Sequence, residues 1–314
     1  MQVAPGITLI DTKLGGFTGI TSAYLVAGTA PALVDTGAQT SARDVESALN
    51  DIGLRSADLA WLVLTHIHLD HCGAVGDLAN AFPKATVVVH RRGARHLTSP
   101  ERLVTASAAV YGETAPMYGG LSAVAEERIV AVEDGFEVNV GGSRRLVMME
   151  ALGHARHHMA VLDEATGTVM AGDALGVQFA GAGLYQALPP PDVDIELSLA
   201  TLDRLARLEP ETLLLGHFGP VPDPAEAIAV AGDQQRTLGE ATRAAWREGG
   251  APAATEAAAQ AVSLINAVGD SQAIIRWREL GWDINTVRGL VDWAERTEGT
   301  TDEETGDERP EARR

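Results

Sequence analysis

Cysteine, lysine and long apolar runs are scarce in this chain of 314 residues. Its one cysteine, Cys72, excludes an intrachain disulfide, which fits a reducing compartment. No apolar stretch approaches the roughly 20 residues that cross a bilayer, so no membrane-spanning helix is expected. The first residues have neither the basic nor the apolar region of a secretory signal. We therefore expect a cytoplasmic protein that does not bind membranes.

Positive charge is scarce as well. Lys and Arg total 24 against 43 Asp and Glu, which gives a formal net charge of −19. Such a chain repels phosphate backbones at long range, and this argues against a nucleic acid partner. Hydrophobic residues still make up 46% of the chain, beside 33 glycines and 14 prolines, so wholly disordered and collagen-like classes are excluded. We expect a globular protein with two domains or one large domain.

Residues 1–222 alternate short β-rich runs with helical stretches, which is typical of an α/β fold. Apolar runs such as ALVDTG and LAWLVLTH come first. A second group of strands covers about residues 128–173, where glycine-rich turns favour antiparallel pairing. Between the two groups, residues 99–127 predict a helical insertion that either covers its own apolar face or forms the wall of a pocket.

The C-terminal part of the sequence has a different pattern. Residues 223–297 predict a helical module, in which apolar residues recur at helical spacing over Ile284, Val287, Val291 and Ala294. The module needs a partner surface, and three are open: the rest of the chain, a lid over the functional site, or a second copy in a homodimer. Residues 298–314 are polar, charged and aperiodic, and predict a disordered acidic tail.

The most informative stretch is THIHLDHCG at residues 65–73, where an apolar strand runs out into four possible metal ligands. They are His66, His68, Asp70 and His71. Imidazole and carboxylate bind zinc and other borderline divalent metals. Protonated imidazoles so close together would repel one another, so a purely structural role explains the cluster poorly. The stretch therefore predicts a metal site.

Further ligand-type side chains follow later strands. His154 comes directly after the strand RRLVMMEAL, Asp173 ends TVMAGD, and His217 ends the apolar run LLLGHFG. Loops at the strand ends of one sheet edge are where functional sites assemble. Together with residues 65–73, these side chains are enough for two metals.

In this order, the HxHxDH motif, the GHARHH run, the strand-end Gly-Asp and the late Gly-His resemble the metallo-β-lactamase-fold superfamily. LVDTG at residues 33–37 is similar to the early structural loop of that family. The resemblance covers roughly residues 7–222. It implies an α/β fold of the αββα sandwich type, with the metals at the edge between its two sheets and here with a C-terminal helical module.

The resemblance also implies a role for each ligand-type position. The first metal would be held by His66, His68 and His154 and the second by Asp70, His71 and His217, with Asp173 bridging the two. Such sites belong to hydrolases in which a hydroxide between the metals is the nucleophile. Asp70 would in addition orient that hydroxide and pass a proton to the leaving group. Zinc is the expected ion, and iron and manganese also suit these ligands.

Three further residues are candidates for supporting roles. Asp35 is predicted to anchor a tight turn, with a role behind the metal ligands as its second interpretation. His158 stands where the family has a second histidine of its GHxxxH run, which supports the sheet edge more often than it binds metal. Tyr185, in the long Gly/Pro-rich segment after Asp173, is a candidate to place a hydroxyl near the oxyanion.

The bridging aspartate narrows the activity that the resemblance implies. Asp173 is typical of thioesterases of the glyoxalase II type, lactonases and phosphodiesterases, and not of the true β-lactamases of this fold. We therefore expect a hydrolase of a small-molecule ester, thioester or lactone. A phosphodiester or phosphotriester hydrolase with the same metals is the alternative. A mononuclear iron enzyme resembling persulfide dioxygenases is the third hypothesis.

Overall fold

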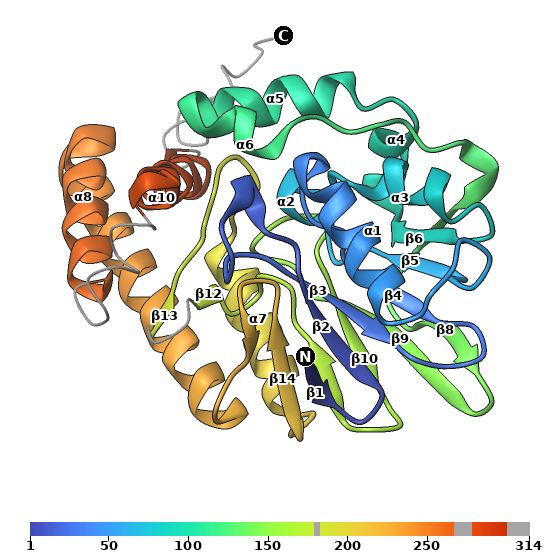
Figure 1. Ribbon diagram of the computed structural model, residues 1–314. Coiled ribbons are helices and arrows are strands. Elements are labelled where there is room, and N and C mark those ends of the chain that lie inside the picture. The colour runs from blue at the N-terminus through green and yellow to red at the C-terminus, as the bar shows by residue number, and fades with distance from the viewer. Residues whose placement is uncertain (179–182, 267–277, 300–314) are drawn as a thin grey trace, which may run out of the picture.

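Two β-sheets packed face to face form the centre of the structure, a computed structural model that describes residues 1–178, 183–266 and 278–299 (Figure 1). In order across the first sheet, the strands are β1 (Gln2–Ala4), β2 (Ile7–Asp11), β3 (Ser22–Val26), β4 (Ala32–Val34), β5 (Trp61–Val63), β6 (Thr86–His90) and β7 (Ile129–Val132). The second sheet has the order β15 (Gly219–Pro220), β14 (Thr212–Leu215), β11 (Thr168–Met170), β10 (Met159–Asp163), β9 (Arg144–Glu150) and β8 (Phe136–Gly141). A short ladder joins β12 (Val177–Gln178) to β13 (Leu184–Tyr185).

Helices cover both outer faces, so the predicted αββα sandwich is confirmed (Figure 1). The helices on the side of the first sheet are α1 (Ala42–Asp51), α2 (Leu69–Cys72), α3 (Val75–Ala81), α4 (Arg91–Thr98), α5 (Glu101–Tyr111) and α6 (Ala115–Tyr118). The other side carries α7 (Ile195–Ala206) and the start of α8 (Pro224–Asn266), and α10 (Trp282–Glu298) packs beside α8. Among the described helices, none combines the length and the apolar character that crossing a membrane requires.

The sandwich follows from continuous apolar runs along its strands, in which successive side chains point alternately to the two faces of the sheet. In β6, Val87 and Val89 face the helices over the first sheet, whereas Val88 faces the second sheet. Since successive side chains of a strand point to opposite faces, a continuous apolar run is buried on both sides. Each such valine contributes about 1.5–3 kcal/mol by its burial. The two layers of core therefore fix the register on which the site depends.

Parallel neighbours bring distant loops to one edge of the sandwich. In the first sheet β4 and β5 run parallel, with Val34 opposite Val63, so both chains leave the sheet at the same end. In the second sheet β11 and β14 run parallel, with Met170 opposite Leu214. The loops that follow these strands can therefore meet at a single place.

The C-terminal helices are continuous with the sandwich. Ile228 and Ala231, near the start of α8, pack into the core between α7 and the second sheet. The predicted division between residues 222 and 223 stays a prediction. Of the predicted tail, residues 300–314 lie outside the described part of the chain.

The buried face of α10 matches the predicted apolar stripe only in part. Ala294 is buried and Val287 packs against the core, but Ile284 is 63% exposed, although its spacing predicted that it would be buried. The buried face also carries Trp282, Leu290 and Trp293. Large aromatic side chains remove more surface from water than isoleucine does, and they decide which face docks.

Trp293 is predicted to hold α10 in place. Its side chain is 2% exposed, its indole N–H donates to Glu196 Oε2 at 3.1 Å, and the Arg243 guanidinium lies 4.4 Å from its ring centre. Trp293→Ala should lower the free energy of unfolding by about 3–5 kcal/mol, measured by urea denaturation. Ile284→Ala on the same helix should change it by less than about 0.5 kcal/mol. Equal losses in the two variants would show that α10 is not docked through Trp293.

Candidate metal centre

The ligand-type side chains lie just beyond strand ends of both sheets. Residues 65–68 follow β5 and lead into α2, which carries Asp70 and His71. His154, Asp173 and His217 follow β9, β11 and β14 of the second sheet. Loops from the two sheets thus face each other across the edge of the sandwich.

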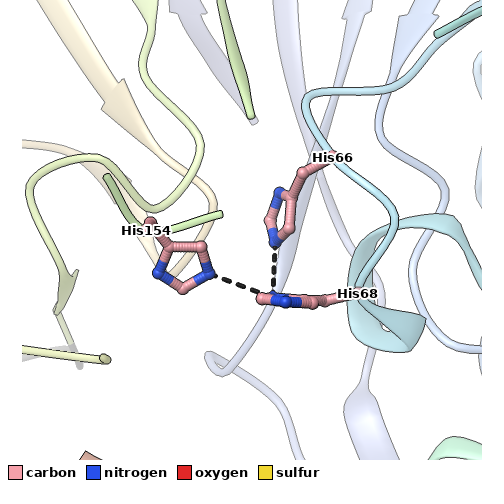
Figure 2. Close-up of side chains that lie close together, drawn as sticks. All are labelled: His66, His68 and His154. Atoms are coloured by element: carbon pink, nitrogen blue, oxygen red, sulfur yellow. Dashed lines mark hydrogen bonds between the residues drawn. The ribbon is translucent and has the colours of Figure 1, made fainter. Parts of the chain in front are cut away.

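Three histidine nitrogens converge on one point. His66 Nε2 and His154 Nε2 each lie 3.0 Å from His68 Nδ1 (Figure 2). Figure 2 shows His66 and His154 approaching His68 from different segments, one from each sheet. Their donor atoms all lie within 4.8 Å of one another, as the ligands of a single ion must.

A second group lies beside the first. His71 Nε2 and His217 Nε2 are 3.1 Å apart, and Asp70 Oδ2 lies 3.4 Å from His217 Nε2 and 3.8 Å from His71 Nε2. These three residues also bring their donor atoms within 4.8 Å of one another. The side chain of Asp70 is only 10% exposed, so its carboxylate is held inside the group.

Asp173 stands between the two groups. Its Oδ2 lies 3.4 Å from His71 Nε2 and 3.5 Å from His217 Nε2, and 3.7 Å from His154 Nε2 and 4.0 Å from His66 Nε2. Its Oδ1 is buried and accepts no hydrogen bond from the described residues. A buried carboxylate oxygen without a donor is costly unless a cation neutralises it.

The protein holds the far side of the imidazoles and leaves the converging nitrogens free. His154 Nδ1 lies 2.8 Å from the main-chain oxygen of Ala187, and His217 Nδ1 lies 2.9 Å from that of Ile20. A ring nitrogen that donates to a carbonyl fixes the orientation of the ring, so in the neutral ring the opposite nitrogen carries the lone pair that binds a metal.

Asp35 supports the second group from behind. It adopts a left-handed backbone conformation, with φ of 60°, directly after β4. Its carboxylate accepts the Thr65 N–H at 2.8 Å and lies 3.0 Å from His71 Nδ1. Asp35 thereby ties the turn to the histidine, and both roles proposed for it from the sequence meet in one side chain.

The other two supporting candidates lie in different surroundings. His158 Nε2 accepts the main-chain N–H of Asp173 at 3.0 Å, so it positions the carboxylate between the two groups and does not face them with that nitrogen. Tyr185 is fully buried in the core under the first sheet and does not line the cavity described below. The role proposed for Tyr185 from the sequence stays a prediction.

Burial and charge act in opposite directions at this site. Burial, together with neighbouring His71 and His68, places the pKa of His66 well below its usual value, so His66 is neutral. Burial also lowers the pKa of His217, but the charge of Asp173 outweighs it and raises the pKa to about 9. Burial raises the pKa of Asp173, and His71 and His217 overcome this and hold it well below its usual range. The carboxylates therefore require positive charge, which a divalent cation would also supply.

The donor set fits two divalent ions. Neutral imidazole nitrogens and ionised carboxylates are the ligands that zinc and its neighbours prefer, and thiolates are absent from the described groups. The carboxylate of Asp173 adds a ligand where the two groups meet, since its Oδ2 lies within 4.0 Å of ring nitrogens of both. The residues present thus fit the metals that the sequence motifs imply.

A cavity opens over the two groups, and helices distant in sequence form its wall. Tyr111 of α5 and Trp282 of α10 both line it. The Trp282 ring meets His217 edge to face at 4.8 Å, and its N–H donates to the Tyr118 hydroxyl at 3.1 Å. Tyr118 in turn stacks on Tyr111 at 3.8 Å. The helical insertion and the C-terminal helix therefore both contribute to the pocket wall.

Gly216, next to His217, leaves no room for a side chain. A Cβ there would lie 2.6 Å from His71 Cε1 and 2.7 Å from Asp173 Oδ1. Gly216→Ala should therefore push both side chains aside and weaken divalent-metal affinity roughly 10–100-fold, measured by competition with a chromophoric chelator. Gly232→Ala is the matched control, because its nearest neighbour would lie 3.9 Å away. Wild-type metal affinity in Gly216→Ala would show that this close packing does not position the ligands.

Comparison with known proteins gives consistent matches over the sandwich. The sequence model of the metallo-beta-lactamase superfamily matches residues 16–217. The metallo-beta-lactamase fold-containing protein ST1585 of Sulfurisphaera tokodaii is 30% identical over 210 residues, or 65% of this chain and 75% of that protein. The probable metallo-hydrolase YqjP of Bacillus subtilis is 24% identical over 241 residues, which cover 70% of this chain and 74% of YqjP. The family match includes every ligand-type residue of the two groups and Asp173.

A solved structure and a local sequence match extend the comparison. The structure of ST1585 from Sulfolobus tokodaii has a TM-score of 0.66 at 24% identity and covers 91% of this chain and 98% of that one, which shows the same fold. The N-acyl homoserine lactonase AttM of Azorhizobium caulinodans is 40% identical over 50 residues, which are 16% of this chain and 18% of that protein.

Proposed function

The chain belongs to the metallo-beta-lactamase superfamily, and on that premise we propose that it is a metal-dependent hydrolase of small-molecule esters, thioesters or lactones with two divalent ions. One observation carries the proposal of two ions. Asp173 Oδ2 lies within 4.0 Å of ring nitrogens from both groups. A carboxylate in that position can serve two ions at once.

The chain's own residues divide the work. The first ion would be held by His66, His68 and His154 and the second by Asp70, His71 and His217, with Asp173 shared. Bound there, the ions would supply a water of lowered pKa and would stabilise negative charge on the substrate oxygen. Zinc is the ion we expect, and iron and manganese suit the same ligands.

Asp70 is proposed to handle the proton. Its carboxylate lines the cavity and lies beside His217 and His71. Burial raises its pKa, but His71 and His217 outweigh this and hold the pKa below its usual value, so the group is ionised and able to accept a proton. It would take the proton from the attacking water and deliver it to the leaving group.

The cavity wall supports an acyl substrate. Beyond the ligand-type residues it is lined by apolar side chains such as Val177 and Leu188, and no lysine or arginine of the described residues lines it. An adjoining hollow shares His68 and Tyr111 with it and continues along Val110 of α5. A carbonyl group with an attached carbon chain suits these surfaces better than a charged phosphodiester does. The local similarity to a lactonase supports lactones within this class.

The test is a comparison of hydrolysis rates with protein that has been stripped by a chelator and reloaded with Zn or Mn. Phenyl esters, acyl thioesters and γ-lactones are compared with a chromogenic phosphodiester. We expect acyl hydrolysis that is lost on stripping, returns on reloading and reaches its maximum at two ions per chain. A faster phosphodiester rate would favour the phosphodiester or phosphotriester alternative. If no substrate is hydrolysed and the protein binds one iron tightly, the dioxygenase-like alternative would be favoured.

A further inference from the structure

Asn285 is a polar residue of the cavity wall that is not one of the ligand-type residues. It lies in the first turn of α10, its side chain lines the cavity, and the residue is only 6% exposed. Within the described part of the chain, no group forms a hydrogen bond with its carboxamide. The amide atoms are nevertheless not sealed from solvent, and Asn285 is one of the residues that line the cavity. A carboxamide in such a place lacks partners that a bound molecule can provide.

The position of Asn285 is fixed by its neighbour on the helix. The Thr286 hydroxyl donates to the main-chain oxygen of Gln186 at 3.0 Å and accepts the N–H of Leu188 at 3.2 Å. Gly289, one turn later, allows close contact, because a Cβ there would lie 2.0 Å from Leu188 O. These contacts hold the first two turns of α10 against residues 186–188, and Asn285 lies within this part of the helix.

The same segment connects α10 to the ligand-type residues. Ala187, between Gln186 and Leu188, presents its main-chain oxygen to His154 Nδ1 at 2.8 Å. Residues 186–188 thus contact both Thr286, the neighbour of Asn285 on α10, and His154. These contacts tie the first turn of α10 and the ligand-type residues to the same segment, and this favours a defined position for the carboxamide, as a binding group for a substrate requires.

Other polar groups of α10 at the cavity are already engaged. Thr286 uses its hydroxyl in the two bonds to residues 186 and 188, and the Trp282 N–H donates to Tyr118. The carboxamide of Asn285 both donates and accepts. It therefore matches an amide or a hydroxyl group and gains nothing from a methylene group in the same place.

We propose that Asn285 binds an amide or hydroxyl group that the substrate carries near its scissile carbonyl, so that acyl compounds with such a group are preferred over plain alkyl ones. This inference rests on the proposed hydrolase function. The substrate would then be held at two points. Its carbonyl would lie at the site around Asp173, and its amide or hydroxyl group would lie at Asn285. Asn285 is thus a specificity-determining residue contributed by the C-terminal helix.

The test uses pairs of substrates of equal length. Phenyl N-acetylglycinate and phenyl pentanoate have acyl chains of equal length that differ in an internal amide, and an N-acyl homoserine lactone is paired with an alkyl γ-lactone. In metal-loaded wild-type protein, kcat/KM should favour the amide-bearing member by about tenfold. In Asn285→Leu, which keeps the branched shape and removes the polar atoms, this ratio should fall to about one. Ile284→Ala, exposed on the same helix, should keep the wild-type ratio.

Binding is measured separately from turnover. Saturation-transfer NMR with N-acetylglycinamide should show binding to the wild-type protein and weaker binding to Asn285→Leu. An unchanged ratio of kcat/KM, or an equal loss for both members of a pair, would overturn the role of Asn285. If neither pair is hydrolysed, the proposed function fails, and equal binding of N-acetylglycinamide to both proteins would then overturn the role of Asn285 as well.

Discussion

Asp173→Ala is expected to lower kcat/KM for acyl substrates by about 1,000-fold and to reduce the number of divalent ions bound per chain. The carboxylate lies within 4.0 Å of ring nitrogens of both groups. Without it, two ions would be held only by separate ligands and would repel each other across the site. A loss of several kcal/mol of transition-state stabilisation corresponds to such a rate factor. Metal content by mass spectrometry and steady-state kinetics measure the two effects.

Alanine at position 173 could also disturb the loop, so the conformation of the variant is checked and a control variant is measured. The main-chain N–H of Asp173 still donates to His158, so the loop should keep its conformation, which circular dichroism checks. Asp203→Ala removes an exposed carboxylate from α7 and should change neither metal content nor kcat/KM. Full metal content with full activity in Asp173→Ala would show that the two groups do not share a ligand.

The ligand-type residues were predictable because their signal is local. THIHLDHCG places four of them within six consecutive positions, and the buried strand β5 fixes where this segment begins. His154, Asp173 and His217 each follow an apolar run that ends abruptly. Strands that run in the same direction end at the same edge of a sheet, and the family resemblance supplied the meeting of the two sheets at that edge. The αββα arrangement followed from the same pattern through the family resemblance.

The cavity wall was not predictable in the same way. Asn285 and Trp282 reach the site only because α10 docks through Trp293 and because Gly289 allows contact with Leu188. These contacts join residues nearly a hundred positions apart, and no local pattern carries them. Helical spacing even favoured burial of Ile284, which is exposed. Periodicity marks that a helix has an apolar face, but packing against partners distant in sequence decides which face is used.

Asp70→Asn should separate metal binding from proton transfer. Asparagine keeps the size of the side chain and one oxygen, so the second group should retain most of its affinity for a divalent ion. Its amide cannot take a proton from water and pass it on, which should lower kcat by about 100-fold to 10,000-fold. The expected result is thus a protein with near-normal metal content and little turnover.

Two measurements decide whether Asp70 has this role. A leaving group of low pKa needs little protonation, so phenyl esters with electron-withdrawing substituents should lose less activity than alkyl esters or thioesters of alkyl thiols in Asp70→Asn. Asp77→Asn is the matched control, because that carboxylate, on α3, accepts a hydrogen bond from the Ser122 hydroxyl and belongs to neither group. Asp70→Asn with unchanged turnover and unchanged metal content would exclude Asp70 from proton transfer. An equal loss for every leaving group would instead assign Asp70 to holding the metal alone.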